Sequence, residues 1–288
     1  MTVPRSRGHS AFLQSDRPQI ERGQRMASYK PVTAALRVLE VLAGVNRLGS
    51  RANVAEIHHV TGIDKATVVR MLETLIAAGY VLRDKDQAIY RPTGKTLSLG
   101  TAYDRHRIVS DIVSDDLADF RQQIGWPSDV ALFDHDAMLV VQSSRNNEPL
   151  HFKRASGFRA PVLATSLGLA YLANCSESER EDYLARAAAD PAAWNDIARN
   201  LPLLNVKLAA IRKQGFATME ESYSRSYYES KFFSIGVPIM TADRIFGAIN
   251  VIYLKSALTE KAAQDKLLLP LQEVANRMAV KLTGSAAF

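Results

Sequence analysis

The chain has 288 residues, of which 47% are hydrophobic, and a formal net charge of +6 at pH 7. This composition can build a substantial core, and the length leaves room for about two domains of ordinary size. No stretch approaches the roughly 18 to 20 uninterrupted apolar residues of a membrane helix, and no apolar segment follows the N-terminal arginines, so we expect a cytoplasmic protein with no membrane partner.

The single cysteine, Cys175, cannot form an internal disulfide or assemble a cysteine-rich zinc site. We expect a small, partly buried thiol there, and neither a metal nor another cofactor.

The positive charge is confined to the first third of the chain. Residues 1–95 contain 15 Lys and Arg against 8 Asp and Glu, whereas residues 96–288 contain 21 against 22. This uneven distribution indicates a polyanionic partner for the N-terminal part alone.

Residues 1–27 are polar and basic, with no apolar face at either helical or strand period, and we expect a disordered basic tail. A start at Met26 is an open alternative.

Residues 28–94 are predicted to form a winged helix-turn-helix domain. The first helix begins near Val32 and ends at Gly44 to Gly49. Its expected buried stripe is Val32, Leu36, Leu39, Val41 and Leu42.

A second helix is predicted to start at Asn53, with Glu56 completing a capping box. After a tight turn at Gly62, Asp64 is expected to cap a third helix that ends at Gly79. The apolar positions of this third helix repeat at three and four residues: Val68, Met71, Leu72 and Leu75.

Two short runs of β-forming residues in 80–91 surround a polar tip, which predicts a hairpin. Three helices followed by a hairpin make a winged helix-turn-helix. Residues 95–125 are charged and mainly helical in pattern, and we expect a linker helix that ends before Pro127.

Residues 126–288 are predicted to form an α+β domain, a sheet covered by helices. Its strands are expected at 130–133, 138–143, 232–240 and 245–254, and its helices at 167–173, 177–188, 203–214 and 261–282.

The solvent face of the third helix carries small and hydroxylated side chains and one arginine, Arg70. In helix-turn-helix proteins this helix enters the major groove, where an arginine can bond a guanine, while basic residues of the wing reach phosphates. The alternative is that these charges only solvate a helical face. The candidate DNA-binding residues are Arg51, Lys65, Ala66, Thr67, Arg70, Thr74, Arg83, Lys85 and Arg91.

Two other classes of function fit the sequence less well. A hydrolase would use Ser166 or Cys175 as nucleophile and His135 or His151 as base, but no G-x-S-x-G motif surrounds either nucleophile, and no P-loop or metal-binding pair is found. A constitutive architectural DNA-binding protein would leave about 160 residues of sensor-like domain unexplained.

Several segments resemble the IclR family of bacterial transcription factors. They lie at residues 32–39, 61–75, 79–81, 164–173, 211–216, 236–239 and 246–250. The resemblance implies a GAF-like α/β effector-binding domain, a homodimer or homotetramer, a palindromic double-stranded DNA operator, and RNA polymerase as a further partner. Within the family, residues 126–130, 134–138, 150–154, 234–238 and 253–259 look closest to the activators of 3-(3-hydroxyphenyl)propionate breakdown.

By position, the resemblance implies an effector pocket built from Ser166, Leu167, Met219, Glu220, Ser234, Asn250 and Ile252. Where members that bind small keto-acids have a carboxylate and serines, this sequence has larger and less polar side chains, which suits an aromatic acid. Arg154 is the candidate partner of the effector carboxylate, with Arg159 and Arg225 as alternatives. The expected function is therefore activation of an aromatic-compound catabolic operon; the alternative is a repressor of the same family that responds to a different small organic acid.

Overall fold

The structure is a computed structural model that describes residues 30–84, 87–100, 105–144, 157–285 and 288. The chain forms two compact units, which divide between Gly100 and Thr101. None of the helices in these ranges has the length and hydrophobicity that crossing a lipid bilayer requires.

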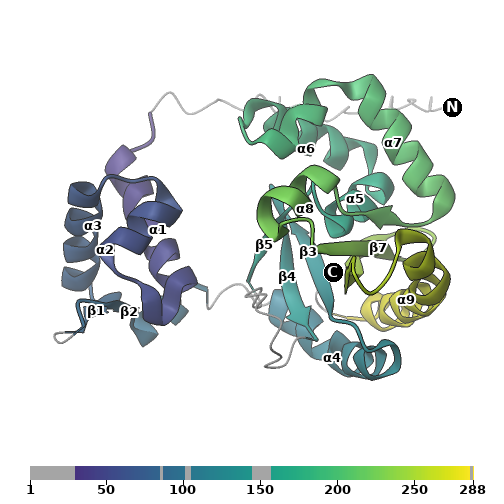
Figure 1. The fold of residues 1–288 in the computed structure, drawn as a ribbon, viewed down its shortest axis with the longest axis horizontal. Helices are drawn as coiled ribbons and strands as arrows, with labels where there is room; N and C mark the ends of the chain where they lie inside the picture. Colours follow the sequence, from purple (N-terminus) through teal and green to yellow (C-terminus); the bar gives the residue numbers. More distant parts are fainter. Residues whose placement is uncertain (1–29, 85–86, 101–104, 145–156, 286–287) are drawn as a thin grey trace, which may run out of the picture. The chain divides into compact units, whose positions relative to one another are not determined.

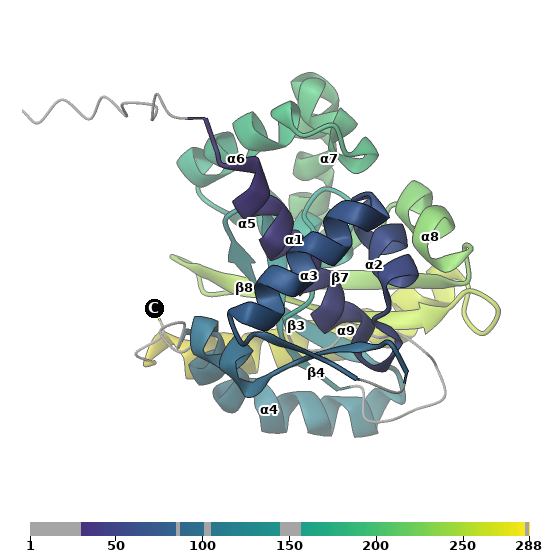
Figure 2. The same ribbon diagram turned by 90° about the vertical axis from the view of Figure 1, so that its left-hand side faces the viewer.

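The first unit is a three-helix bundle with a hairpin (Figures 1 and 2). Its elements are α1 (Thr33–Leu48), the 3-10 helix η1 (Gly49–Arg51), α2 (Val54–Thr61), α3 (Lys65–Ala77), β1 (Val81–Arg83), β2 (Tyr90–Pro92) and the 3-10 helix η2 (Gly94–Gly100). The two strands pair antiparallel, so the predicted winged helix-turn-helix is confirmed.

The helix starts in this unit follow from local capping. The Asn53 side chain accepts a hydrogen bond from the Glu56 N–H (3.0 Å), and the Asp64 side chain accepts one from the Thr67 N–H (2.9 Å), as predicted. The reciprocal half of the capping box is absent at the described Asn53, because its N–H donates to the Arg51 carbonyl instead.

The buried stripe of α1 differs from the prediction. Val41 and Leu42 are buried, but Val32, Leu36 and Leu39 are 70%, 50% and 60% exposed. The prediction for these three residues was wrong, because the period of a helix identifies its apolar side but not how far the neighbouring helices cover it.

The second unit contains a six-stranded antiparallel sheet of order β5-β4-β3-β8-β7-β6. The strands are β3 (Ser128–Asp134), β4 (Ala137–Ser143), β5 (Arg159–Pro161), β6 (Ala217–Thr218), β7 (Phe232–Met240) and β8 (Ile245–Leu254). The helices are α4 (Arg105–Ile124), α5 (Ser166–Asn174), α6 (Glu177–Ala189), η3 (Ala193–Arg199, a 3-10 helix), α7 (Leu201–Gln214), α8 (Glu221–Tyr228) and α9 (Glu260–Thr283).

Helices cover both faces of this sheet (Figure 1). On one face, α4 and α9 bury their apolar sides against β3, β7 and β8, with Phe120 and Tyr253 among the largest fully buried side chains. On the other face, α5, α6 and α7 form a second hydrophobic cluster. The predicted α+β class of this unit is therefore confirmed.

The segment expected as a linker helix divides between the units. Its first residues lie in η2, which belongs to the first unit, and α4 begins at Arg105. Four apolar side chains of α4, spaced by four, four and three residues, are buried in the core of the second unit: Val109, Val113, Leu117 and Phe120.

Candidate functional site

The recognition-type helix α3 has one buried and one exposed face. Val68, Leu72 and Leu75 are buried in the core of the first unit, while Ala66 and Arg70 on the opposite side are exposed. Arg70 therefore points to solvent from a helix whose other face is fixed by packing, which is the arrangement that major-groove recognition needs.

Two threonines flank this face. The Thr67 side chain is half-buried beside the Asp64 cap, and Thr74 donates its hydroxyl hydrogen to the Arg70 carbonyl (2.9 Å). The Thr74 hydroxyl oxygen thus remains an acceptor, whereas its proton is used within the helix.

The turn between α2 and α3 is held by a set of short-range bonds. Gly62 adopts the left-handed conformation (φ 69°), which Gly reaches without steric cost. The Thr61 hydroxyl donates to the Ile57 carbonyl (2.7 Å), and Arg47 donates to the Val60 carbonyl (2.9 Å). These bonds fix the end of α2 and attach it to α1, directly before the turn that leads into α3.

The basic candidates outside α3 have different surroundings. Arg51, the last residue of η1, and Lys65, the first residue of α3, are exposed. The Arg83 guanidinium lies 6.0 Å from the Tyr90 ring centroid, and Arg91 pairs with Asp84 at 3.4 Å on the hairpin. Lys85 lies outside the described residues.

The effector candidates Ser166 and Ser234 form a direct contact. Their hydroxyl oxygens lie 2.7 Å apart, and neither side chain is exposed. Ser166 is the first residue of α5, whose N-cap Thr165 accepts from the Gly168 N–H. At Gly236, two residues after Ser234, an added Cβ would lie 2.6 Å from the Ser166 carbonyl oxygen, so the close approach of α5 to β7 requires glycine.

A row of polar side chains crosses the sheet beside this pair. Ser143, Asp129, Asn250 and Gly236 are register partners on β4, β3, β8 and β7. Because alternate residues such as Ile235 pack against α4 and α9, the row faces α5.

The members of this row hydrogen-bond to one another. The Asn250 side-chain oxygen accepts from the Asp129 N–H (2.9 Å), and the Ser143 hydroxyl donates to the Asp129 carboxylate (2.8 Å). Asp129 and Ser143 were not predicted as site residues. A charged residue within an otherwise apolar strand was the signal that could have identified Asp129.

The remaining pocket candidates line different parts of this region. Leu167 is fully buried in the α5 cluster, and Ile252 is the register partner of Ser234. Met219 packs with Ala164 and Tyr223 in a separate small cluster. Glu220 occupies the N-cap position of α8 without a side-chain capping bond, and its carboxylate pairs with Lys207 of α7.

Helix α8 places an aromatic cluster next to Met219. This cluster was not predicted from the sequence. Tyr223 contacts the ring of Tyr227 at a centroid distance of 4.7 Å, and Trp194 and Tyr228 pack edge-to-face on Tyr223. These rings supply stacking surfaces beside a predicted aromatic-acid site.

The two described arginine candidates lie at different places in the second unit. Arg154 lies outside the described residues. Arg159 is paired with Asp134 and Asp136 at the distant end of β3 and β4, which occupies its guanidinium. Arg225 is exposed on α8.

The groups proposed for a hydrolase are not arranged for catalysis among the described residues. Ser166 bonds to Ser234, and burial raises the pKa of the Cys175 thiol to about 11. His135 lies in the β3–β4 turn, and its carbonyl accepts from Arg186. His151 lies outside the described residues. A nucleophilic thiol needs a lowered pKa, so Cys175 has the opposite environment.

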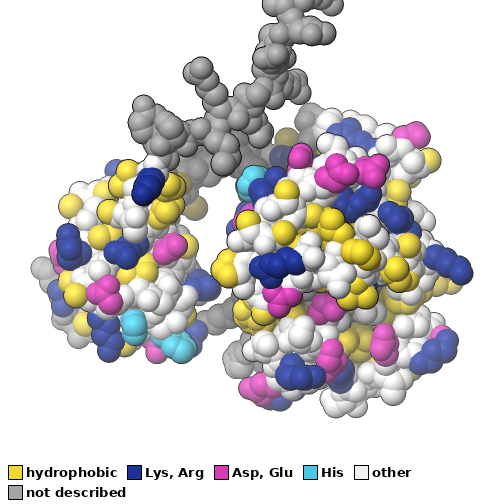
Figure 3. All heavy atoms as spheres, turned by 90° about the horizontal axis from the view of Figure 1, so that it is seen from above, with side chains coloured by type: hydrophobic (Ala, Val, Ile, Leu, Met, Phe, Trp, Pro, Cys, Tyr) yellow, Lys and Arg dark blue, Asp and Glu magenta, His cyan; other side chains and the backbone are white. Residues whose placement is uncertain are grey.

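Charged and apolar side chains are mixed on the visible faces of both units. Figure 3 shows Lys and Arg at several places on the first unit and hydrophobic side chains among charged ones on the second. Leu201, Leu203 and Val206 of α7 are the exposed large hydrophobic residues of that helix.

Comparisons with known proteins agree with this architecture. The IclR helix-turn-helix domain model matches residues 34–85, and the model "Bacterial transcriptional regulator IclR C-terminal" matches residues 93–280. The chain is 27% identical over 248 residues to the Pca regulon regulatory protein of Pseudomonas putida, covering 85% of this chain and 82% of that protein.

Two further relatives extend the comparison. The chain is 23% identical over 279 residues to the DNA-binding transcriptional repressor YiaJ of Escherichia coli K12, covering 96% of this chain and 95% of the repressor. It has the fold of an IclR homolog from Microbacterium hydrocarbonoxydans crystallised with 4-hydroxybenzoate, with a TM-score of 0.56, 18% identity, and coverage of 86% of this chain and all of the other.

Proposed function

This chain belongs to the IclR family of bacterial transcriptional regulators, and we propose on that premise that it activates an operon for the breakdown of an aromatic compound when a small aromatic carboxylic acid binds its second unit. It is a regulator and not an enzyme, and its family and fold neighbours are transcriptional regulators as well. Three features are proposed: the chemical class of the effector, the residues that contact the operator, and activation rather than repression.

The observation that carries the effector proposal is the polar row beneath α5. Asp129, Asn250 and Ser234 are buried polar residues on one face of an otherwise apolar sheet, and Ser166 of α5 bonds to Ser234. These groups already bond to one another, and a hydroxylated aromatic acid, which offers both donors and acceptors, would add to or exchange with those bonds. The bound 4-hydroxybenzoate of the Microbacterium homolog supports this ligand class.

For DNA binding, we propose that Arg70 reads a base in the major groove while Lys65, Arg51 and the wing residues Arg83, Lys85 and Arg91 contact phosphates. The exposed face of α3 and the basic excess of residues 1–95 support this assignment.

We propose further that the chain acts as a homodimer on a palindromic operator. Three apolar side chains at the start of α1 are at least half exposed: Val32 at the N-cap, and Leu36 and Leu39 within the helix. A second copy of α1 would remove this apolar surface from water and place two α3 helices for two half-sites. Activation then follows through contact with RNA polymerase.

The test begins with selection of genomic fragments by the purified full-length protein, which identifies an operator. Binding to that operator is then titrated by fluorescence anisotropy with and without 4-hydroxybenzoate and 3-(3-hydroxyphenyl)propionate. A thermal-shift series with the same acids checks binding independently, since a ligand of the native state raises the melting temperature. No shift with any aromatic acid would refute the effector class.

A repressor that responds to a different organic acid is the second candidate, favoured by the similarity to YiaJ over nearly the full chain. A reporter gene behind the selected operator separates the two. Expression that falls when the regulator is supplied without effector would establish repression.

A further inference from the structure

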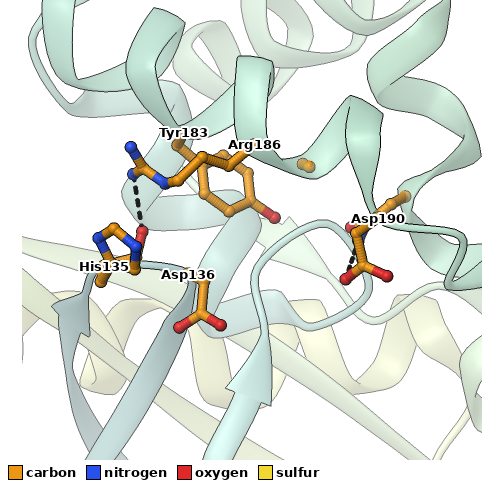
Figure 4. A pocket seen from close by; sticks show the side chains of 7 residues that line it. His135, Asp136, Tyr183, Arg186 and Asp190 are labelled. Carbon is orange, nitrogen blue, oxygen red and sulfur yellow. Dashed lines mark hydrogen bonds between the residues drawn. The ribbon is translucent and has the colours of Figure 1, made fainter. Parts of the chain in front are cut away.

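A pocket of about 210 Å³ lies between the β3–β4 turn, α6 and the start of η3 (Figure 4). None of its lining residues belongs to the candidate DNA or effector sets. They are His135, Asp136, Tyr183, Arg186, Ala187, Asp190 and Asn195. Three of them, at positions 183, 186 and 187, share one face of α6 because of their helical spacing, and Asp190 is the C-cap of this helix.

Asp190 supplies negative charge to this pocket. Its carboxylate accepts from the Ala192 N–H and from the Asn195 side-chain NH₂, both at 3.0 Å. Both donors are neutral, and no described Lys or Arg forms an ion pair with this carboxylate. Asp190 is also the C-cap of α6, where Arg199 donates to the backbone carbonyls of Ala188 and Asp190 (3.1 and 2.7 Å) and offsets the partial negative charge of the helix C-terminus, so the negative charge at this end of the pocket is that of the Asp190 carboxylate.

Asn195 adds an acceptor that lacks a partner. The residue is 4% exposed, and its side-chain oxygen accepts no hydrogen bond from the described residues. The orientation of its amide is fixed by Asp190, which needs the NH₂ group as donor. A buried oxygen without a donor is costly, so a bound donor at this position would be stabilising.

Tyr183 lies between the two carboxylates. Its side chain is 2% exposed, and Figure 4 shows the hydroxyl pointing toward the space between Asp136 and Asp190. Burial raises the pKa of the phenol, and the negative charges of Asp136 and Asp190 raise it further. The neighbouring positive group, Arg186, is held at the edge by its hydrogen bond to the His135 carbonyl (2.8 Å).

We propose that this pocket binds a small organic cation with a primary ammonium group. The ammonium would donate to the Asp190 carboxylate and the Asn195 oxygen, with Asp136 and the Tyr183 oxygen as further acceptors, because an ammonium carries three donors and no acceptor. A metal ion fits less well, since the described residues contain no group of three or more His, Cys, Asp or Glu side chains that could hold one. This inference does not rest on the proposed function.

The test is isothermal titration of putrescine into the full-length protein, with 1,4-butanediol as an uncharged probe of the same carbon chain. We expect saturable binding of putrescine and none of the diol. Asp190→Asn removes the charge and keeps the size of the side chain, and it should weaken putrescine binding about 10- to 100-fold, the range for a hydrogen bond to a charged group.

Asp196→Asn is the matched control, because Asp196 lies in η3 next to Asn195 but pairs with Arg199 and does not line the pocket. It should leave putrescine binding unchanged. If Asp190→Asn lowers the melting temperature, the comparison is repeated with Asp136→Asn and its control Asp134→Asn. Both carboxylates pair with Arg159, but of the two only Asp136 lines the pocket. Absence of putrescine binding, equal binding of the diol, or equal losses in variant and control would overturn the proposal.

Discussion

The hydroxyl oxygens of Ser166 and Ser234 lie 2.7 Å apart where the first turn of α5 meets β7. The two residues are 68 positions apart in sequence, and each is the other's hydrogen-bond partner in a fully buried environment. Glycine at position 236 permits the contact, because a Cβ there would meet the Ser166 carbonyl. The pair therefore joins a helix N-terminus to the sheet at the predicted effector site.

Ser234→Ala should lower the free energy of unfolding by about 1 to 3 kcal/mol, since it leaves the buried Ser166 hydroxyl without its partner. Urea denaturation followed by circular dichroism measures the change. The double variant with Ser166→Ala should lose less than the sum of the single losses, because two residues in contact are coupled. Additive losses would show that the bond contributes nothing beyond its separate groups.

Arg70→Ala should weaken binding to the selected operator by about 1 to 3 kcal/mol and leave the fold intact, because an arginine–guanine contact carries discrimination of that size. Fluorescence anisotropy at fixed salt gives the affinity. Lys213→Ala removes one positive charge from an exposed position on α7 and serves as the control for net charge. Equal affinities of the Arg70 variant and the parent protein would remove Arg70 from the interface.

Asn250→Leu should cut the affinity for an aromatic acid by roughly 1 to 3 kcal/mol through loss of a buried hydrogen bond. The same change deprives the Asp129 N–H of its acceptor, so the melting temperature should also fall. Calorimetric titration of 3-(3-hydroxyphenyl)propionate, below the melting temperature of both proteins, separates the two effects. Operator binding without effector should stay near that of the parent protein, and an unchanged effector affinity would place Asn250 outside the site.

The Cys175 thiol should react slowly with Ellman's reagent at pH 8. Burial raises its pKa to about 11, so the native protein holds about a hundredfold less thiolate than an ordinary thiol with a pKa of 9.0. The rate should increase with pH toward 11 and become fast at pH 8 in denaturant. A fast reaction of the native protein at pH 8 would contradict the assigned environment.

The same shift predicts the direction of a pH effect on stability. The unfolded thiol ionises near 9.0 and the native thiol only near 11, so the unfolded state loses its proton first. This contribution to the free energy of unfolding is complete below pH 9 and is lost as the pH increases toward 11. Comparison with Cys175→Ser in urea denaturation at pH 8 and 10.5 isolates it, and a loss of equal size in the variant would assign the effect to other groups.

Much of the secondary structure could be predicted from local chemistry. Caps such as Asn53, Asp64 and Ser176 accept hydrogen bonds from N–H groups three residues later, and Gly62 adopts a positive φ. These features depend on neighbours in sequence. The buried face of α3 was likewise predictable, because its apolar residues repeat with the helical period: Val68, Met71, Leu72 and Leu75.

The tertiary structure decided what those elements cover and contact. The pairing of Asn250 with Asp129, 121 residues away, depends on the register of β3 against β8, which local patterns do not specify. Leu36 lies on the apolar side of α1 and is nevertheless 50% exposed, so the period of α1 did not determine its burial. The sequence by itself therefore determined most of the helices and strands and the family, but it did not predict β5, β6 or α8. Only the packing of distant elements decided which polar side chains meet inside the second unit, because hydrogen bonds between strands and helices form only once the sheet is assembled.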